Sequence, residues 1–285
     1  MKTLYFECGM GAAGDMITAA LLEISCRADP GSSDRVDHNK MERFVSRFNG
    51  IGIPGVTMKA EKGEKKGVTG THVRILVNGE EEHEPEAADH HHEHHHGDEH
   101  SDEHSHNHEH HHHHHEHRGM DEVKAVIEKL AVDQDVREDV LAVYGLIAEA
   151  ESKVHGTDVS EIHFHEVGTM DAIADVTAVC MLIHEISPDE IVSSPVATGF
   201  GTVRCAHGIL PVPAPATALL LSGIPAYAGD QMGELCTPTG AALIKHFAGK
   251  FSQMPVMCTE AVGYGLGTKD FETANCLRVF YGESF

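Results

Sequence analysis

No two cysteines in this 285-residue sequence have the CxxC spacing, and the seven present are odd in number and widely spaced. Neither a zinc knuckle nor a disulfide framework is therefore indicated. No apolar run approaches the roughly 18 residues needed to span a bilayer. The first ten residues, MKTLYFECGM, are interrupted by Glu7 and Gly9, unlike a signal peptide. These absences predict a reduced, cytoplasmic protein without a membrane partner.

Basic residues are also scarce. The chain has 21 Lys and Arg against 45 Asp and Glu, which gives a net charge of −24. No basic patch stands out, and an acidic surface argues against nucleic acid or an anionic membrane as the main partner. A P-loop motif ending in GK[ST] is missing as well, and we assign no GxGxxG fingerprint to the loop at 7–15.

Histidine, in contrast, is abundant and concentrated. Residues 80–117 hold 18 of the 26 histidines and 13 acidic residues, with no Lys or Arg. Imidazole suits Ni, Cu and Zn, and it is neutral, hence able to bind them, above a pKa of about 6.5. The tract is internal and interrupted by Glu and Asp, whereas a purification tag is terminal and pure His. We interpret it as a reservoir or delivery arm for a transition metal. The candidate ligands are His90, His91, His92, His94, His95, His96, His110, His111, His112, His113, His114 and His115.

Helical and strand-like segments alternate outside this tract, which predicts a mixed α/β fold of unknown strand order. Strands are expected at 3–7, 71–77, 190–196, 255–262 and 276–281. Helices are expected at 16–24, 41–48, 121–130, 136–154, 171–183, 213–221 and 240–247. The expected organisation is an N-terminal α/β part (1–77), a His-rich loop that is disordered without metal (78–119), and a second α/β part (120–285) in one domain with the first.

The densest polar group outside the tract is the HFHE segment at 163–166, followed by Asp171 and Asp175. In an extended segment His163 and His165 face the same way, and Asp171 and Asp175 share one face of the next helix. Two imidazoles with carboxylates suit a divalent transition metal. We predict His163, His165, Asp171 and Asp175 as metal ligands, with Glu166 or His165 as the general base. The alternative is a histidine packed in the core and Asp171 capping its helix.

Three other segments offer candidate substrate contacts. In the loop ECGMGAAGD at 7–15, small residues would let backbone amides approach a phosphate, although a tight packing turn explains them equally well. Cys205 and His207, two residues apart, could bind a soft metal or a sulfur-bearing substrate, or could be a buried Cys beside a surface His. The segment 234–240 places Thr237 and Thr239 at a helix start, and 263–270 is expected to be flexible and to close over a ligand. The predicted substrate-binding residues are Gly11, Asp15, Cys205, His207, Thr237 and Thr239.

Five motifs, in order, resemble the LarC family of nickel-insertion proteins: MGAAGDM, FHEVGTMDAIADV, GTVRCAHGILPVPAPAT, GELCTPTGAALI and GYGLGTKDF. The resemblance implies a nickel chelatase of the lyase class. Its reaction inserts Ni(II) into pyridinium-3,5-bisthiocarboxylic acid mononucleotide, forming a carbon–nickel bond flanked by two sulfur ligands. The product is the nickel-pincer cofactor of lactate racemase and related apoenzymes, and the family consumes CTP with Mn or Mg.

Members of that family continue past the equivalent of Phe285 into a C-terminal domain associated with CTP. We therefore expect CTP binding to be absent from this chain, or to be supplied by a separately encoded domain. An oligomer is compatible with the sequence. Two alternatives stay open: a nickel storage or metallochaperone protein without catalysis and, ranked last, a metal-dependent phosphohydrolase.

Overall fold

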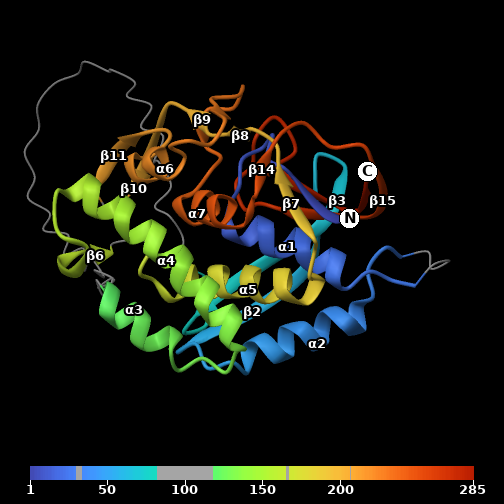
Figure 1. Cartoon of the computed structure of the whole chain (residues 1–285), viewed down its shortest axis with the longest axis horizontal. Coiled ribbons are helices and arrows are strands. Elements are labelled where there is room, and N and C mark those ends of the chain that lie inside the picture. Colours follow the sequence, from blue (N-terminus) through green and yellow to red (C-terminus); the bar gives the residue numbers. More distant parts are fainter. Residues whose placement is uncertain (30–33, 82–117, 165–166, 206) are drawn as a thin grey trace, which may run out of the picture.

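The computed structural model of this chain describes residues 1–29, 34–81, 118–164, 167–205 and 207–285 (Figure 1). A mixed sheet forms its framework, with the strand order β14-β7-β1-β16-β15-β3-β2 and with β4 paired to β3. The mixed α/β class predicted from the sequence is confirmed. The strands of this sheet are β1 (Lys2–Glu7), β2 (Val56–Lys65), β3 (Val68–Val77), β4 (Glu80–Glu81), β7 (Glu190–Ser193), β14 (Lys250–Phe251), β15 (Met257–Leu266) and β16 (Cys276–Ser284).

Strand directions bring several loops to one edge of the sheet. β1 is parallel to β7 and antiparallel to β16, and β15 is also antiparallel to β16. Strands β1, β7 and β15 therefore run the same way and end at the same edge. Open α/β sheets bind their ligands in crevices outside the carboxyl ends of strands. The loop between β1 and the first helix lies at this edge.

Helices cover one face of the sheet. α1 packs on β15 and on α5, with which it runs side by side in Figure 1, and α4 packs on α5. From Met170 to Ile183 every residue of α5 except Asp171 is buried, as expected of a helix enclosed by other elements. The helices are α1 (Gly14–Ser25), α2 (His38–Asn49), α3 (Met120–Ile127), α4 (Gln134–His155), α5 (Met170–Ile186), α6 (Pro215–Leu220) and α7 (Pro238–Phe247), with a 3-10 turn η1 at Val159–Glu161.

Two glycines allow α1 to approach the sheet closely. A Cβ on Gly263 would lie 1.9 Å from the carbonyl oxygen of Ala20, and one on Gly265 would lie 1.8 Å from that of Met16. Both glycines belong to β15, so the prediction of a flexible segment at 263–270 was wrong for residues 263–266. Any side chain at either glycine would push the helix away from the sheet.

Short strands complete the structure around this framework. They are β5 (Arg118–Gly119), β6 (His163–Phe164), β8 (Val196–Ala197), β9 (Gly199–Phe200), β10 (Thr202–Cys205), β11 (Gly208–Pro211), β12 (Ala226–Tyr227) and β13 (Gly233–Glu234). β10 and β11 form a hairpin, and β5 pairs antiparallel with β6. The predicted disorder of 78–119 is therefore wrong for the strand residues of β4 and β5, whereas 82–117 lie outside the described residues. None of the helices in the described ranges is long and apolar enough to cross a bilayer.

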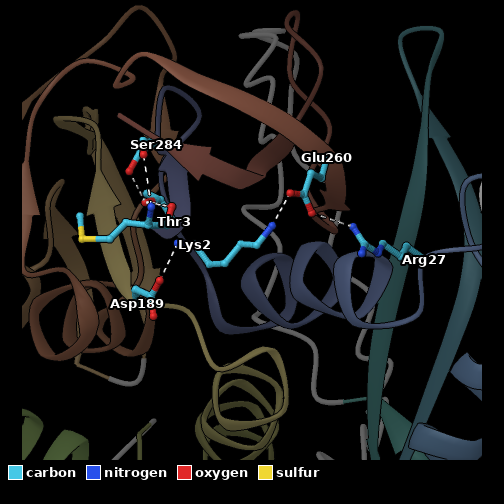
Figure 2. A network of polar contacts seen from close by, with 7 residues as sticks. Lys2, Thr3, Arg27, Asp189, Glu260 and Ser284 are labelled. Carbon is cyan, nitrogen blue, oxygen red and sulfur yellow. Dashed lines mark hydrogen bonds and ion pairs between the residues drawn. The ribbon is translucent and has the colours of Figure 1, made fainter.

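Polar contacts fasten the start of β1 at the edge opposite the β1–α1 loop (Figure 2). The Lys2 amide donates to Asp189 at 2.7 Å, and its ammonium pairs with Glu260, which also pairs with Arg27 at 3.4 Å. The hydroxyls of Thr3 and Ser284 lie 2.8 Å apart. The start of β1 is thus joined to β15, to β16 and to the residues before β7.

Candidate functional site

Two carboxyl groups meet where α1 and α5 begin. Asp15 is in the first turn of α1, and Asp175 lies one turn into α5. The backbone N–H of Asp15 lowers the pKa of the Asp175 carboxyl group, and a Cβ on Gly14 would lie 2.4 Å from Oδ2 of Asp175. Glycine at position 14 therefore makes room for this carboxylate against the helix N-terminus, where a negative charge is favoured.

Burial keeps both groups from ionising at their usual pH. It raises the pKa of Asp15 to about 6. Hydrogen bonds to the ionised carboxylate, including one from the Met16 amide at 2.7 Å, act in the opposite direction and lower it. The pKa of Asp175, which is only 8% exposed, is also raised well above its usual value, by burial and by the nearby charges of Asp171 and Asp15. Oδ1 of Asp175 has no hydrogen-bond partner among the described residues. A carboxylic acid and a carboxylate with separated pKa values can exchange protons with a bound substrate.

Of the HFHE segment, the structure describes the side chain of Phe164, which packs on Tyr144. The Phe164 ring is buried against Tyr144 of α4 with 6.2 Å between centroids, and the Tyr144 hydroxyl donates to the Val167 carbonyl at 3.1 Å. The pKa of Tyr144 is raised by burial first, then by the charges of Asp175 and Asp171. Tyr144 thus contacts both Phe164 and Val167, which precedes α5.

The predicted metal ligands are only partly visible. His165, Glu166 and the side chain of His163 lie outside the described residues, as do all twelve candidate ligands of the His-rich tract. Asp171 and Asp175 lie on α5, which is capped by Thr169 rather than by Asp171. Within the described ranges, no group of three or more His, Cys, Asp or Glu side chains is arranged to hold a metal ion. The metal-site assignment stays a prediction.

Two of the predicted substrate-binding loops lie against each other. The Ala12 amide donates to Leu235 at 3.1 Å, and the Thr237 amide donates to Ala12 at 3.0 Å. Gly11 has a φ of +79°, and a Cβ there would lie 2.0 Å from the Leu235 carbonyl oxygen, so it serves a tight packing turn. Thr237 caps α7 by accepting from the Gly240 amide at 3.2 Å, as its sequence position predicts. Its hydroxyl also lies 3.0 Å from that of Thr239.

The remaining pair, Cys205 and His207, flanks the turn of the β10–β11 hairpin. The His207 ring lies 5.0 Å from the ring of His155, at the end of α4, and His155 is 3.4 Å from Glu151. Cys205 is half-buried, and all seven cysteines are free thiols. Burial raises the pKa of Cys8 to about 12 and that of Cys276 to about 11, so neither thiol is a thiolate at neutral pH.

One interpretation of the sequence was wrong, namely that the loop at 7–15 has no GxGxxG fingerprint. Gly9, Gly11 and Gly14 have the GxGxxG spacing, and the structure places Gly9 and Gly11 between β1 and α1 and Gly14 at the first position of α1, the context in which such loops bind nucleotide phosphates. Here the N-terminus of α1 already accommodates Asp175, so a phosphate would have to meet the tip of the loop. The pairing of Asp15 with Asp175 was also missed.

Comparison with known proteins identifies the family of this chain. The family described as nickel insertion proteins is matched over residues 4–284. The chain therefore belongs to the nickel insertion protein family, as its motifs indicate. Its relatives include a pyridinium-3,5-bisthiocarboxylic acid mononucleotide nickel insertion protein of Clostridium acetobutylicum, which is 42% identical over 99% of this chain and 64% of the relative.

Two further relatives show the same coverage. A protein of the same description from Desulfitobacterium hafniense is 34% identical over 99% of this chain and 59% of its own length. A putative nickel insertion protein of Dictyoglomus thermophilum is 33% identical over 99% of this chain and 61% of its own length. The chain thus spans about three fifths of the length of these relatives. No solved structure matches it.

Proposed function

We propose that this chain carries the nickel-inserting site for pyridinium-3,5-bisthiocarboxylic acid mononucleotide. In this reaction Ni(II) replaces a proton on an aromatic carbon and gains two sulfur ligands. The metal keeps its oxidation state, so the chemical requirement is a base that accepts the proton. The observation that carries the proposal is the pairing of half-buried Asp15 with buried Asp175 where α1 and α5 begin, a place where burial raises the pKa of both carboxyl groups. The product would be the nickel-pincer cofactor of lactate racemase-type enzymes.

The acid–base roles can be divided among a few groups. Glu166 and His165 stay our predicted bases on sequence grounds. Among the described carboxyl groups, Asp15 combines burial with a pKa of about 6, so at neutral pH it is ionised and still basic enough to accept a proton. The pKa of Asp175 is also raised, by burial first, so Asp175 is the second described carboxyl group that could hold a proton at this site. His163, His165, Asp171 and Asp175 are the proposed ligands for nickel in transit, with Asp175 binding it only after losing its proton.

The His-rich tract would supply the nickel, because its two ends are fixed near this site. At one end, Glu81 pairs with Arg74 at 2.7 Å, and its charge raises the pKa of Asp15. At the other end, Arg118 donates to the Gly168 carbonyl at 3.4 Å, just before α5, and β5 pairs with β6. A tethered arm with many weak sites raises the local concentration of its ligand.

The complete reaction would need more than the matched region. We assign CTP, with Mn or Mg, to a domain that the longer relatives have outside it, whether on the same chain or on another. The loaded nucleotide would pass to a nickel-pincer-dependent apoenzyme. The chemistry classifies the protein as a lyase. The cytoplasm would supply the nucleotide, the nickel and the apoenzyme in one compartment.

A direct experiment separates insertion from storage, the function that the tract alone would favour. The full chain is incubated with the dithiocarboxylate nucleotide, NiCl2, CTP, MnCl2 and the additional domain of a longer relative. Mass spectrometry of the released nucleotide should show nickel in place of one proton. If nickel is bound in several equivalents per chain but the nucleotide is recovered unchanged, the protein is a store and the proposal fails.

A further inference from the structure

A cavity of about 540 Å³ opens on the face of the sheet opposite α1, a size typical of small-molecule sites. Gly263 and Gly265 of β15 face α1. Side chains alternate along a strand, so Tyr264 faces the other way, into this cavity. We call it the open-face cavity. Its lining includes Glu7, Gly9, Met10, Arg35, Tyr264 and Arg278.

Two guanidinium groups give the open-face cavity its binding character. Arg278 pairs with Glu7, and Arg35 stacks on Tyr264 with 4.4 Å between its Cζ and the ring centroid. Arg35 also lies 3.6 Å from the buried carboxylate of Glu23. A guanidinium carries five N–H donors, and the contacts among the described residues use only part of them. Ring stacking and ion pairs hold the two groups in place before a ligand arrives, which favours binding of a planar or tetrahedral anion.

The third wall of the cavity is the tip of the GxGxxG loop. Gly9 and Met10 line it. Within the described ranges, the amides of these two residues take no part in a hydrogen bond. Gly9 is exposed, and a Cβ there would meet only the Tyr227 hydroxyl, at 3.9 Å. The loop that starts in the cavity leads into α1, whose second residue is Asp15, so it joins the cavity to the carboxyl pair.

We propose that the open-face cavity binds the substrate nucleotide, with Arg35, Arg278 and the tip of the GxGxxG loop receiving its phosphate and a ring thiocarboxylate. The assignment rests on the proposed function and names the part of the chain that selects its substrate. The ligand is an aromatic mononucleotide with at least two anionic groups, which matches two guanidinium groups across a cavity of this volume.

Calorimetric titration without nickel tests the assignment, with nicotinic acid mononucleotide as a stable probe that shares the pyridinium ring, a carboxylate and the phosphate. Arg278→Gln should weaken binding about tenfold or more, because a charge-assisted contact is lost. Arg35→Lys, which keeps the charge opposite Glu23 but loses the fork of donors, should also weaken it. Arg47→Gln is the matched control, since Arg47 likewise pairs with a carboxylate and packs on a ring but does not line the cavity.

Several results would overturn the assignment. One is that both folded cavity variants bind the probe within twofold of wild type. Another is that the wild-type chain does not bind the probe at millimolar concentration. The third is that the wild-type chain binds CTP tightly but does not bind the probe. The nickel-insertion assay keeps this outcome separate from the proposed function. If the wild-type chain forms the product and Arg278→Gln leaves the KM for the nucleotide unchanged, insertion stands and the cavity assignment fails.

Discussion

Replacing Asp15 by Asn should make the protein more stable at neutral pH. Burial raises the pKa of this carboxyl from 3.8 to about 6, whereas the unfolded chain keeps the lower value. The folded state therefore holds the proton more tightly, and its stability falls as the pH rises from about 3.8 to about 6. Each pH unit in this window corresponds to about 1.4 kcal/mol. Above about pH 6 the ionised Asp15 costs up to about 3 kcal/mol, and an amide avoids this cost.

Urea unfolding followed by circular dichroism measures the effect. At pH 7.5 we expect Asp15→Asn to raise the free energy of unfolding by about 1–3 kcal/mol, and at pH 4 the gain should nearly vanish. Asn retains an oxygen that can accept from the Met16 amide. Asp135→Asn is the control, because Asp135 is also in the first turn of a helix but is exposed. It should lower stability by a few tenths of a kcal/mol.

Two results would refute this reasoning. One is an Asp15→Asn variant that is no more stable than wild type at pH 7.5. The other is a gain of the same size at pH 4 and pH 7.5, which would show that the Asp15 carboxyl is not responsible through its ionisation.

Three further predictions concern the nickel supply, the HFHE segment and the helix packing. Replacing residues 82–117 by a Gly/Ser linker should remove most of the nickel equivalents that calorimetry detects, and with them the nickel binding that is lost below about pH 6. The linker variant should still insert nickel at saturating nickel. An unchanged nickel stoichiometry, or no product, would contradict the interpretation of the tract as a reservoir. His165→Ala or Glu166→Ala should abolish product formation while bulk nickel binding persists, and wild-type rates in both would make the segment structural. Asp139 lies 2.7 Å from the ring nitrogens of both His184 and His246 and so links α4 to α5 and α7. Asp139→Ala should lower the free energy of unfolding in urea by about 1–2 kcal/mol. An unchanged unfolding midpoint would show that these contacts do not stabilise the fold.

Much of the fold could be predicted because its periodicity is local. Segments 3–7, 136–154 and 171–183 correspond to β1, α4 and α5, with apolar spacings that match strand or helix. β2 was missed because Val56–Lys65 is largely polar and exposed, so hydrophobic alternation is weak. The glycines of β15 suggested a loop because their reason, the close approach of α1, is a tertiary contact.

The site was predicted in pieces but not as a whole. Asp15 and Asp175 were each singled out, in separate segments and for separate roles. Their contact depends on the crossing of α1 and α5, which are far apart in sequence, so no local pattern encodes it. The open-face cavity has the same origin, since Arg35, Tyr264 and Arg278 meet only through the sheet order.

Product formation by the Asp15→Asn variant tests the central claim most directly. Wild-type and variant chains are compared at saturating nickel with nucleotide, CTP, MnCl2 and the additional domain, and the nickel-bearing nucleotide is quantified by mass spectrometry. The account predicts that the variant is folded, binds nickel through its tract as the wild type does, and forms product at least a hundredfold more slowly, the usual lower range for loss of a general base. A wild-type rate of product formation in the folded variant would contradict the placement of the chemistry at the start of α1 and α5.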